Sequence, residues 1–152
     1  MTEYQLKDDK KALKPMIIMF NAYKAIIKIV LEDIKNYDFD LNEFSVFEVV
    51  YHKERITVQD IKNKMLVANS SLTYILDKLE KKRLIKRKQC FSDKRVYYVS
   101  LTDEGLLKAN DIFPKHYKKM NEVFKCLTDE EKIMLGELLK KVGKNANDSS
   151  LS

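Results

Sequence analysis

Glycine, proline and cysteine are scarce in this chain. Its 152 residues include three Gly, two Pro and two Cys. So few Gly and Pro argue against a turn-rich all-β sandwich and favour helices. Two Cys are too few for a disulfide scaffold, so a reducing cytoplasm is the expected location.

The sequence also lacks a long apolar run. No stretch approaches about 18 uninterrupted apolar residues, so no membrane span is expected. The first 15 residues include acidic side chains and show no apolar core of an export signal. Hydrophobic residues nevertheless make up 45% of the chain, which rules out wholesale disorder and suits a folded domain.

Positive charge is concentrated in one third of the chain. The whole sequence has 29 basic and 23 acidic residues, a net charge of +6. Residues 55–100 contain 12 basic and 4 acidic residues, whereas the other 106 residues contain 17 basic and 19 acidic ones. A local net charge of +8 is typical of a face that binds a polyanion, because Lys and Arg displace counterions from phosphates. A solvated, Lys-rich surface is the alternative that charge alone leaves open.

The first predicted helix is unusually apolar. Apolar residues recur at three- and four-residue steps from Leu13 to Ile34, and Pro15 suits the first turn. The apolar arc is so wide that the helix is expected to be buried on two sides, with a second subunit on one of them. Residues 1–10 are polar and expected to be loose.

Further helices are predicted along the rest of the chain. They are expected over 42–52, over 57–65, from 69 onward, over 102–124, and after 128. Thr57 and Asp60 resemble a capping box with a shorter acid, and Thr128 with Glu131 forms a full one. Gly143 is expected to end the last helix.

The residue pattern changes between positions 84 and 101. Residues 84–91 and 95–101 are rich in β-branched, aromatic and basic side chains, and a short polar turn separates them. This arrangement predicts a β-hairpin. Helix, helix and hairpin in a basic segment indicate a winged helix-turn-helix, in a mainly α (α+β) fold with a two-stranded wing.

The expected contacts with DNA follow from this arrangement. The helix that begins near Asn69 buries its leucine face and offers short polar side chains to the major groove. The hairpin tip carries Lys94 and Arg95 towards a minor groove, where the negative potential attracts a guanidinium group. Asp93 is expected to orient Arg95 through a charge-assisted hydrogen bond.

The stretch from Asn69 to Gly105 resembles the MarR family of bacterial transcription regulators. The resemblance rests on its helix, on the D-x-R wing tip at residues 93–95, and on the leucine-threonine-x-x-glycine start of the next helix at residues 101–105. Residues 41–44 and 51–53 also fit, and the likeness extends over about residues 13–143. The sequence around residues 70–80, with Cys90, is most similar to the MhqR-type, quinone-responsive branch of the family.

The resemblance implies a homodimer that binds double-stranded DNA at a pseudo-palindromic operator. Most members of the family repress, and a small phenolic, quinone-like or other lipophilic compound releases them from DNA. The chain would then divide into an N-terminal dimerisation helix (1–40), a winged helix-turn-helix (41–101), C-terminal dimerisation helices (102–143) and a disordered tail (144–152).

The resemblance and the charge pattern together supply the candidate site residues. The expected DNA-binding residues are Ser70, Ser71, Thr73, Tyr74, Lys78, Arg87, Asp93, Lys94 and Arg95. The expected ligand crevice lies between the dimer helices and the DNA-binding lobe, and its candidate lining residues are Phe20, Tyr23, Phe47, Tyr51, His52 and His116. No motif fixes the second set.

Two cysteines leave a second sensing mechanism open. Arg87 and Lys88 precede Cys90 and favour its thiolate, so a redox-sensing repressor switched through Cys90 or Cys126 is the alternative. The plainer interpretations are a half-buried strand position for Cys90 and a packing role for Cys126. Peroxide sensors of the family use a cysteine in the first helix, and this chain has none before Cys90.

No metal, cofactor or enzyme signature is found in the sequence. The two His and two Cys lack the spacing of a zinc site. There is no glycine-rich phosphate loop, no G-x-S-x-G and no H-E-x-x-H, so an enzyme is not expected. A winged-helix module that binds only proteins is a further alternative, and the net charge of +8 over residues 55–100 argues against it.

Overall fold

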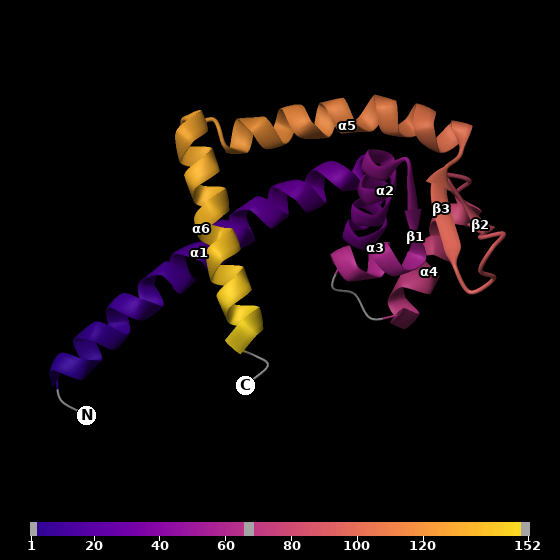
Figure 1. Cartoon of the computed structure of the whole chain (residues 1–152). Coiled ribbons are helices and arrows are strands. Elements are labelled where there is room, and N and C mark those ends of the chain that lie inside the picture. Colours follow the sequence, from indigo (N-terminus) through magenta and orange to yellow (C-terminus); the bar gives the residue numbers. More distant parts are fainter. Residues whose placement is uncertain (1–2, 66–68, 150–152) are drawn as a thin grey trace. The chain divides into compact units, whose positions relative to one another are not determined.

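The computed structural model describes residues 3–65 and 69–149, and most of them are helical (Figure 1). The helices are α1 (Glu3–Lys35), α2 (Leu41–Lys53), α3 (Val58–Met65), α4 (Asn69–Lys81), α5 (Asp103–Val123) and α6 (Asp129–Ser149). The strands are β1 (Arg55–Thr57), β2 (Ile85–Gln89) and β3 (Tyr97–Leu101). The predicted mainly α fold with a winged helix-turn-helix is confirmed. None of the described helices is both long and apolar enough to cross a membrane.

The strands form one antiparallel sheet in the order β1-β3-β2. The predicted hairpin is β2 and β3, whereas β1 is a third strand that the sequence pattern did not reveal, because three residues are too few to show alternation. Ile56 and Arg87 lie opposite Val99 from its two sides. Alternation along the strands therefore gives a buried face around Val99 and an outer face that carries Arg55, Lys86 and Lys88.

The chain divides into two compact units, residues 1–116 and 117–152. In the first unit, the predicted inner face of α4 is buried, with Leu72, Ile75, Leu76 and Leu79 each at most 4% exposed. Beneath it lies an aromatic cluster from the α1–α2 turn, α2 and α5. The Phe113 ring centroid is 5.5 Å from those of Phe44 and Phe47, and Phe39 stacks on Phe47 at 5.2 Å.

Two predicted helix boundaries are wrong. Helix α1 begins at Glu3 rather than near Leu13, so Pro15 lies inside it. The helix begins early because the Gln, Leu, Lys and Ala residues that precede the proline are good helix formers. Helix α6 continues through Gly143 to Ser149, where the sequence indicated a stop and a disordered tail. A glycine ends a helix by adopting a positive φ, and no described glycine has one. Residues 150–152 of that tail lie outside the described residues.

The helix caps agree with the sequence more closely. Thr128 and Glu131 make both hydrogen bonds of a capping box, at 2.8 and 3.2 Å. At α3, the backbone N–H of Asp60 donates to the Thr57 hydroxyl, but the Asp60 carboxylate accepts from that same hydroxyl at 2.7 Å. Only half of the expected box is therefore made, since the Asp side chain is one methylene shorter than Glu.

The leucine-threonine-x-x-glycine motif attaches the wing to the end of α4. The Thr102 backbone N–H donates to the Leu84 carbonyl, its hydroxyl donates to the Arg83 carbonyl, and the Gly105 N–H donates to that hydroxyl at 2.9 Å. A Cβ at position 105 would lie 1.9 Å from the Leu84 carbonyl oxygen. The glycine is therefore required by the close approach of α5 to the segment that follows α4.

The segment after α4 has its own defined geometry. Arg83 adopts a φ of 59°, the Arg83 N–H donates to the Glu80 carbonyl, and the Leu84 N–H donates to the Leu79 carbonyl. This pair of bonds is a Schellman motif with arginine at the position that glycine usually occupies. The end of α4 is therefore fixed on both sides, by its own cap and by Thr102.

Candidate nucleic-acid interface

Helix α4 presents a polar face to solvent. Ser71, Thr73 and Tyr74 are exposed, and Tyr74 retains 65% of its accessible surface. Ser70 belongs to the helix, but its side chain lies outside the described part of the chain. The spacing of exposed and buried positions is that of a recognition helix, with its leucine face packed and its short polar side chains outward.

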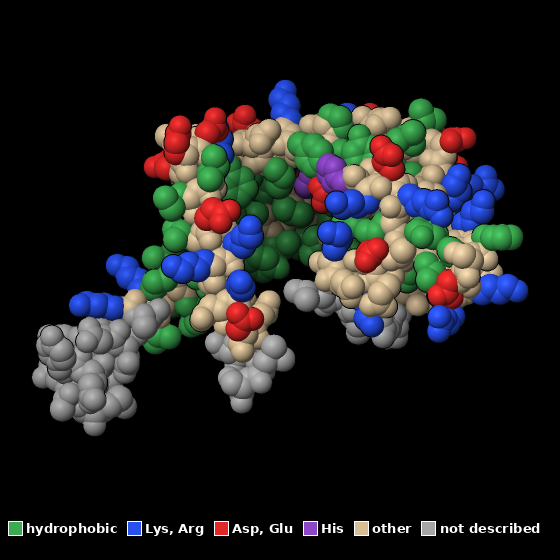
Figure 2. Space-filling view, in the orientation of Figure 1, with side chains coloured by type: hydrophobic (Ala, Val, Ile, Leu, Met, Phe, Trp, Pro, Cys, Tyr) green, Lys and Arg blue, Asp and Glu red, His purple; other side chains and the backbone are tan. Residues whose placement is uncertain are grey.

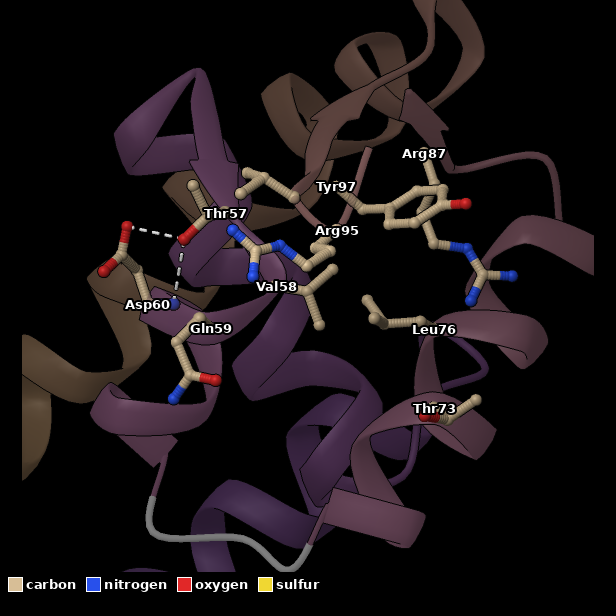
Figure 3. A pocket seen from close by; sticks show the side chains of 10 residues that line it. Thr57, Val58, Gln59, Asp60, Thr73, Leu76, Arg87, Arg95 and Tyr97 are labelled. Atoms are coloured by element: carbon tan, nitrogen blue, oxygen red, sulfur yellow. Dashed lines mark hydrogen bonds between the residues drawn. The ribbon is translucent and has the colours of Figure 1, made fainter. Parts of the chain in front are cut away.

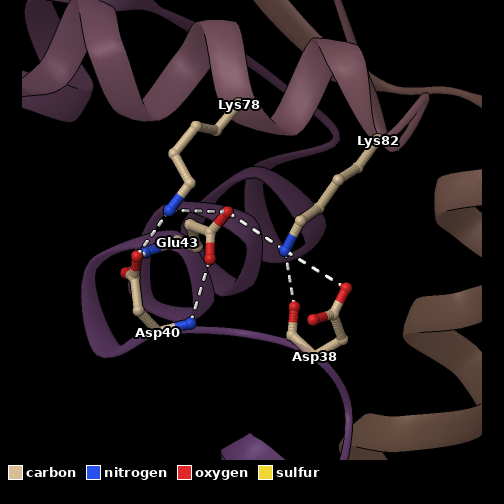
Figure 4. Close-up of polar contacts among 5 residues, drawn as sticks. All are labelled: Asp38, Asp40, Glu43, Lys78 and Lys82. Carbon is tan, nitrogen blue, oxygen red and sulfur yellow. Dashed lines mark hydrogen bonds and ion pairs between the residues drawn. The ribbon is translucent and has the colours of Figure 1, made fainter.

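Lys78 faces acidic residues rather than open solvent. Its Nζ lies 2.8 Å from Asp40 Oδ2 and 3.3 Å from Glu43 Oε1, and Lys82 Nζ lies 3.1 Å from that same Glu43 oxygen (Figure 4). Asp38 completes the cluster by accepting a hydrogen bond from Lys82 at its carbonyl. The Glu43 side chain is only 3% exposed, so these ion pairs attach α4 to the start of α2.

The protonation of this cluster reflects its pairing. The hydrogen bond to Asp40 raises the pKa of Lys78 to about 12. Burial by itself would raise the pKa of Asp40, but the Lys78 hydrogen bond and the Glu43 backbone N–H together hold it below its ordinary value. Asp40 and Glu43 also form a reciprocal capping box, with bonds of 2.8 and 3.0 Å. The D-x-x-E spacing of these two residues in the sequence indicates such a capping box.

Arg87 is paired in a similar way. Its guanidinium lies 2.5 Å from both Asp77 and Glu80 of α4, and its backbone N–H donates to Glu80 at 3.1 Å. These hydrogen bonds lower the pKa of Glu80 and raise that of Arg87. Arg87 was expected to contact DNA, but its ion pairs instead attach strand β2 to α4.

The wing tip has the predicted internal contact. Asp93 accepts from the Arg95 backbone N–H and from its guanidinium at 3.0–3.2 Å, and this pairing lowers the pKa of Asp93. The Arg95 side chain is nevertheless 91% exposed, and Lys94 is exposed beside it. The prediction that Asp93 orients Arg95 is confirmed, and the guanidinium keeps free N–H groups on its outer side.

A cavity of about 510 Å³ lies between α3, α4 and the wing. Arg87 and Arg95 enter it on either side of Tyr97, and Thr73 and Gln59 line its other walls (Figure 3). Residues from both helices of the helix-turn-helix and from the wing thus share one concave surface, on which Asp77 and Glu80 already pair with Arg87. Figure 2 shows Lys and Arg side chains gathered over the sheet and the neighbouring helix.

Four of the six candidate ligand residues meet in one aromatic cluster around Phe113. The ring centroid of Phe113 lies 5.5 Å from that of Phe47, 4.9 Å from that of Tyr51 and 6.4 Å from that of His52. The fourth, His116, packs against Phe44 of the same cluster at 4.7 Å. Phe47 and His116 are buried, and His116 Nδ1 lies 2.8 Å from Asp33 Oδ2. Phe20 and Tyr23 are exposed on α1. Tyr51 and His52 line a cavity of about 480 Å³, which also includes Val50, Glu54, Leu106 and residues 101–103.

The two cysteines differ in their surroundings. Cys90 follows β2, is half-buried, and has its Sγ 3.3 Å from the Ser92 hydroxyl. That hydrogen bond, followed by the backbone N–H groups of Asp93 and Ser92, lowers the pKa of Cys90, rather than the basic neighbours that the sequence suggested. Cys126 follows α5 and is exposed in the single chain. Among the described residues, no three His, Cys, Asp or Glu side chains form a group able to hold a metal ion.

Comparison with known proteins places this arrangement in a family. The model of the MarR family matches residues 39–97, which extend from just before α2 to the first residue of β3. The transcriptional regulator MhqR of Bacillus subtilis is 39% identical over 137 residues, which cover 90% of this chain and 94% of that protein. The chain belongs to the MarR family. This relative is a transcriptional regulator rather than an enzyme.

Two solved structures share the fold. A MarR variant from E. coli in complex with operator DNA is 26% identical, with a TM-score of 0.73 and coverage of 89% of this chain and 96% of that one. NadR, solved with 4-hydroxyphenylacetate, has a TM-score of 0.74 over 84% of this chain and 91% of that one. At 23% identity, the second likeness shows the fold alone.

Proposed function

We propose that this MarR protein is a repressor that binds a pseudo-palindromic operator as a homodimer and leaves it when a small lipophilic compound binds. The observation that carries the DNA-binding role is the joint display of an exposed polar face on α4 and an exposed Arg95 on a wing fixed to that helix. Helix α4 reads the major groove, and Arg95 reaches the adjacent minor groove.

A gel-shift titration with the DNA upstream of the gene tests this role. Thr73→Ala and Arg95→Ala are expected to weaken binding, whereas Lys115→Ala, an exposed lysine on α5, is the charge-matched control and should leave it unchanged. If the wild-type protein shifts this DNA no better than unrelated DNA of equal length, the proposed sequence-specific role is wrong.

The dimer is supported by apolar side chains that the single chain leaves in solvent. Helix α1 exposes Leu13, Met16, Ile17, Ile18, Phe20 and Tyr23, and α6 exposes Ile133, Met134, Leu138, Leu139 and Val142. Large apolar stripes of this kind mark subunit interfaces. Sedimentation equilibrium should give twice the mass of 17.9 kDa, and Ile17→Glu with Ile18→Glu should shift the protein towards monomer.

The proposed effector is a phenolic, quinone-like or other lipophilic compound, as the family resemblance implies. The cavity beside Tyr51 and His52 is large enough for one aromatic ring and is bordered by Thr102, which also holds the end of α4. A ligand that displaces Thr102 would therefore disturb the helix and the wing together. A phenol and a quinone should release wild-type protein from DNA, and Leu106→Trp, which fills the cavity, should not respond.

A thiol switch at Cys90 is the second candidate. It is favoured by the hydrogen bonds that lower the pKa of this thiol, since they stabilise the reactive thiolate in the wing itself. Ser in place of both Cys90 and Cys126 separates the mechanisms. If the double variant still leaves DNA when phenol is added, release depends on ligand binding. If the variant no longer leaves DNA when a quinone is added, release by the quinone depends on a thiol.

A further inference from the structure

One exposed apolar side chain is unrelated to the proposed dimer surface. Phe91 lies in the loop between β2 and β3, and its relative exposure is 104%, the highest value among the exposed large apolar side chains that the structure describes. Apolar side chains on α1 and α6 belong to the stripes described above. Phe91 belongs to the basic wing.

The loop that carries Phe91 is held by hydrogen bonds. The Cys90 N–H donates to the Val96 carbonyl at 2.8 Å, the Val96 N–H donates to the Asp93 carbonyl at 3.0 Å, and Gln89 Nε2 donates to the Lys94 carbonyl at 2.6 Å. The phenyl ring therefore projects from a constrained loop. Holding it ready in solution reduces the entropy that binding would cost.

Cations flank this ring along the chain. Lys88 precedes it, and Lys94 and Arg95 follow it, all three exposed. Asp93 is the acidic group of the loop, and it is already paired with Arg95. An apolar ring among cations is complementary to a partner that offers flat apolar surfaces between phosphates. Double-stranded DNA is such a partner, because an apolar side chain in the minor groove unstacks a base step while nearby Lys and Arg contact the backbone.

We propose that Phe91 enters the minor groove beside each half-site and partly unstacks one base step there. This inference rests on the proposed DNA-binding function and adds a way of reading sequence that needs no hydrogen bond to a base. Pyrimidine–purine steps open most easily, so the wing would favour such a step at its position in the operator. Arg95 then positions the loop at the minor groove, and the ring of Phe91 enters most readily where the base step deforms easily.

The test uses the full-length protein and the operator located by footprinting upstream of its gene. 2-Aminopurine is placed at successive positions under the wing, since its fluorescence rises when a base is unstacked. Wild-type protein at saturation should raise the fluorescence at one step. Phe91→Ala should remove that rise, and Phe91→Leu, which keeps an apolar wedge, should retain part of it.

Affinity gives an independent readout. Phe91→Ala should weaken binding about tenfold when a pyrimidine–purine step lies under the wing, and less when that step is replaced by a stiff A-tract. The matched control is Leu107→Ala, which removes another exposed apolar side chain, 74% exposed on α5, and should change neither readout. Equal melting temperatures of the variants would show that folding is intact.

The outcomes separate this inference from the function on which it rests. If wild-type protein binds no operator DNA, the proposed function fails and the inference fails with it. If wild type and Phe91→Ala bind with the same affinity and the same fluorescence rise, DNA binding stands and insertion is overturned. If Phe91→Ala instead loses binding to phosphatidylserine vesicles and keeps both DNA readouts, the ring serves a membrane surface and insertion is likewise overturned.

Discussion

Two groups of basic residues, one on and around α4 and one at the wing tip, come from the same stretch of sequence but differ in their surroundings. Lys78, Lys82 and Arg87 are at most one-third exposed, and each lies against acidic side chains. On the wing, Lys94 and Arg95 project into solvent. The first group uses its charge to attach α4 to its neighbours. In the second, Asp93 accepts from the Arg95 guanidinium, but the Arg95 side chain stays 91% exposed.

The local net charge of +8 therefore overstates what the surface offers to DNA. Asp38, Asp40 and Glu43 lie before residue 55 in the chain, but they pair with Lys78 of α4 and with Lys82, which follows that helix. The remaining cations are on the wing tip, on the outer face of the sheet and at the end of α4. The net charge of a segment indicates that a basic face exists. Only the ion pairs in the structure show which cations form that face.

The largest effect is expected from Gly105→Ala. This change disturbs the contact of α5 with residues 83–84, which attaches the wing to the end of α4. The new Cβ would meet the Leu84 backbone, which has no flexible side chain to move aside, so the free energy of unfolding should fall by about 3 kcal/mol. Urea denaturation measures it. Gly143→Ala is the control, since nothing lies within 4 Å of that position, and it should be neutral or slightly stabilising.

Glu43→Ala tests the paired group directly. Lys78 and Lys82 would lose a carboxylate that is almost fully buried, although water reaches both ammonium groups. The free energy of unfolding should therefore fall by about 2 kcal/mol, less than for a fully buried pair. Glu137→Ala, at an exposed position on α6, should change it by no more than about 0.5 kcal/mol. Equal losses in the two variants would mean that the cluster does not fix α4.

Lys78→Ala and Arg95→Ala together decide whether the two groups differ in kind. Lys78→Ala should lower the free energy of unfolding and leave the salt dependence of DNA binding unchanged. Arg95→Ala should keep the stability, weaken DNA binding about tenfold, and reduce the slope of log affinity against log salt by about 1. A loss of stability in Arg95→Ala together with a loss of DNA affinity in Lys78→Ala would contradict these two roles.

The smallest effect is a dependence of stability on pH. Asp40 and Glu80 have lowered pKa values, so their stabilisation is present above their ordinary pKa values of 3.8 and 4.5 and is lost as the pH falls further. Lys78 has a raised pKa, so its contribution is complete below pH 10.5 and is lost as the pH rises towards about 12. Asp40→Asn, which still caps α2, should flatten both limbs of the melting temperature plotted against pH.

The sequence predicted those parts of the site that depend on local order. The three- and four-residue spacing of leucines identified the buried face of α4, and the D-x-R motif placed Asp93 within reach of Arg95 two residues away. The outer limits of α1 and α6 were missed because one proline or glycine is a weaker signal than the helix formers around it. Strand β1 was missed because its partner, β3, is more than 40 residues further along the chain.

The sequence by itself determined that this protein has a recognition helix, a basic wing and apolar helices on either side, since each follows from spacing within a few turns or strands. Only the tertiary structure decided which cations remain available to DNA. Lys78 and Lys82 meet their acidic partners across 35 to 44 residues of sequence. Such a meeting depends on how α2 and α4 pack, and the packing is set by the shared apolar core rather than by the charges themselves.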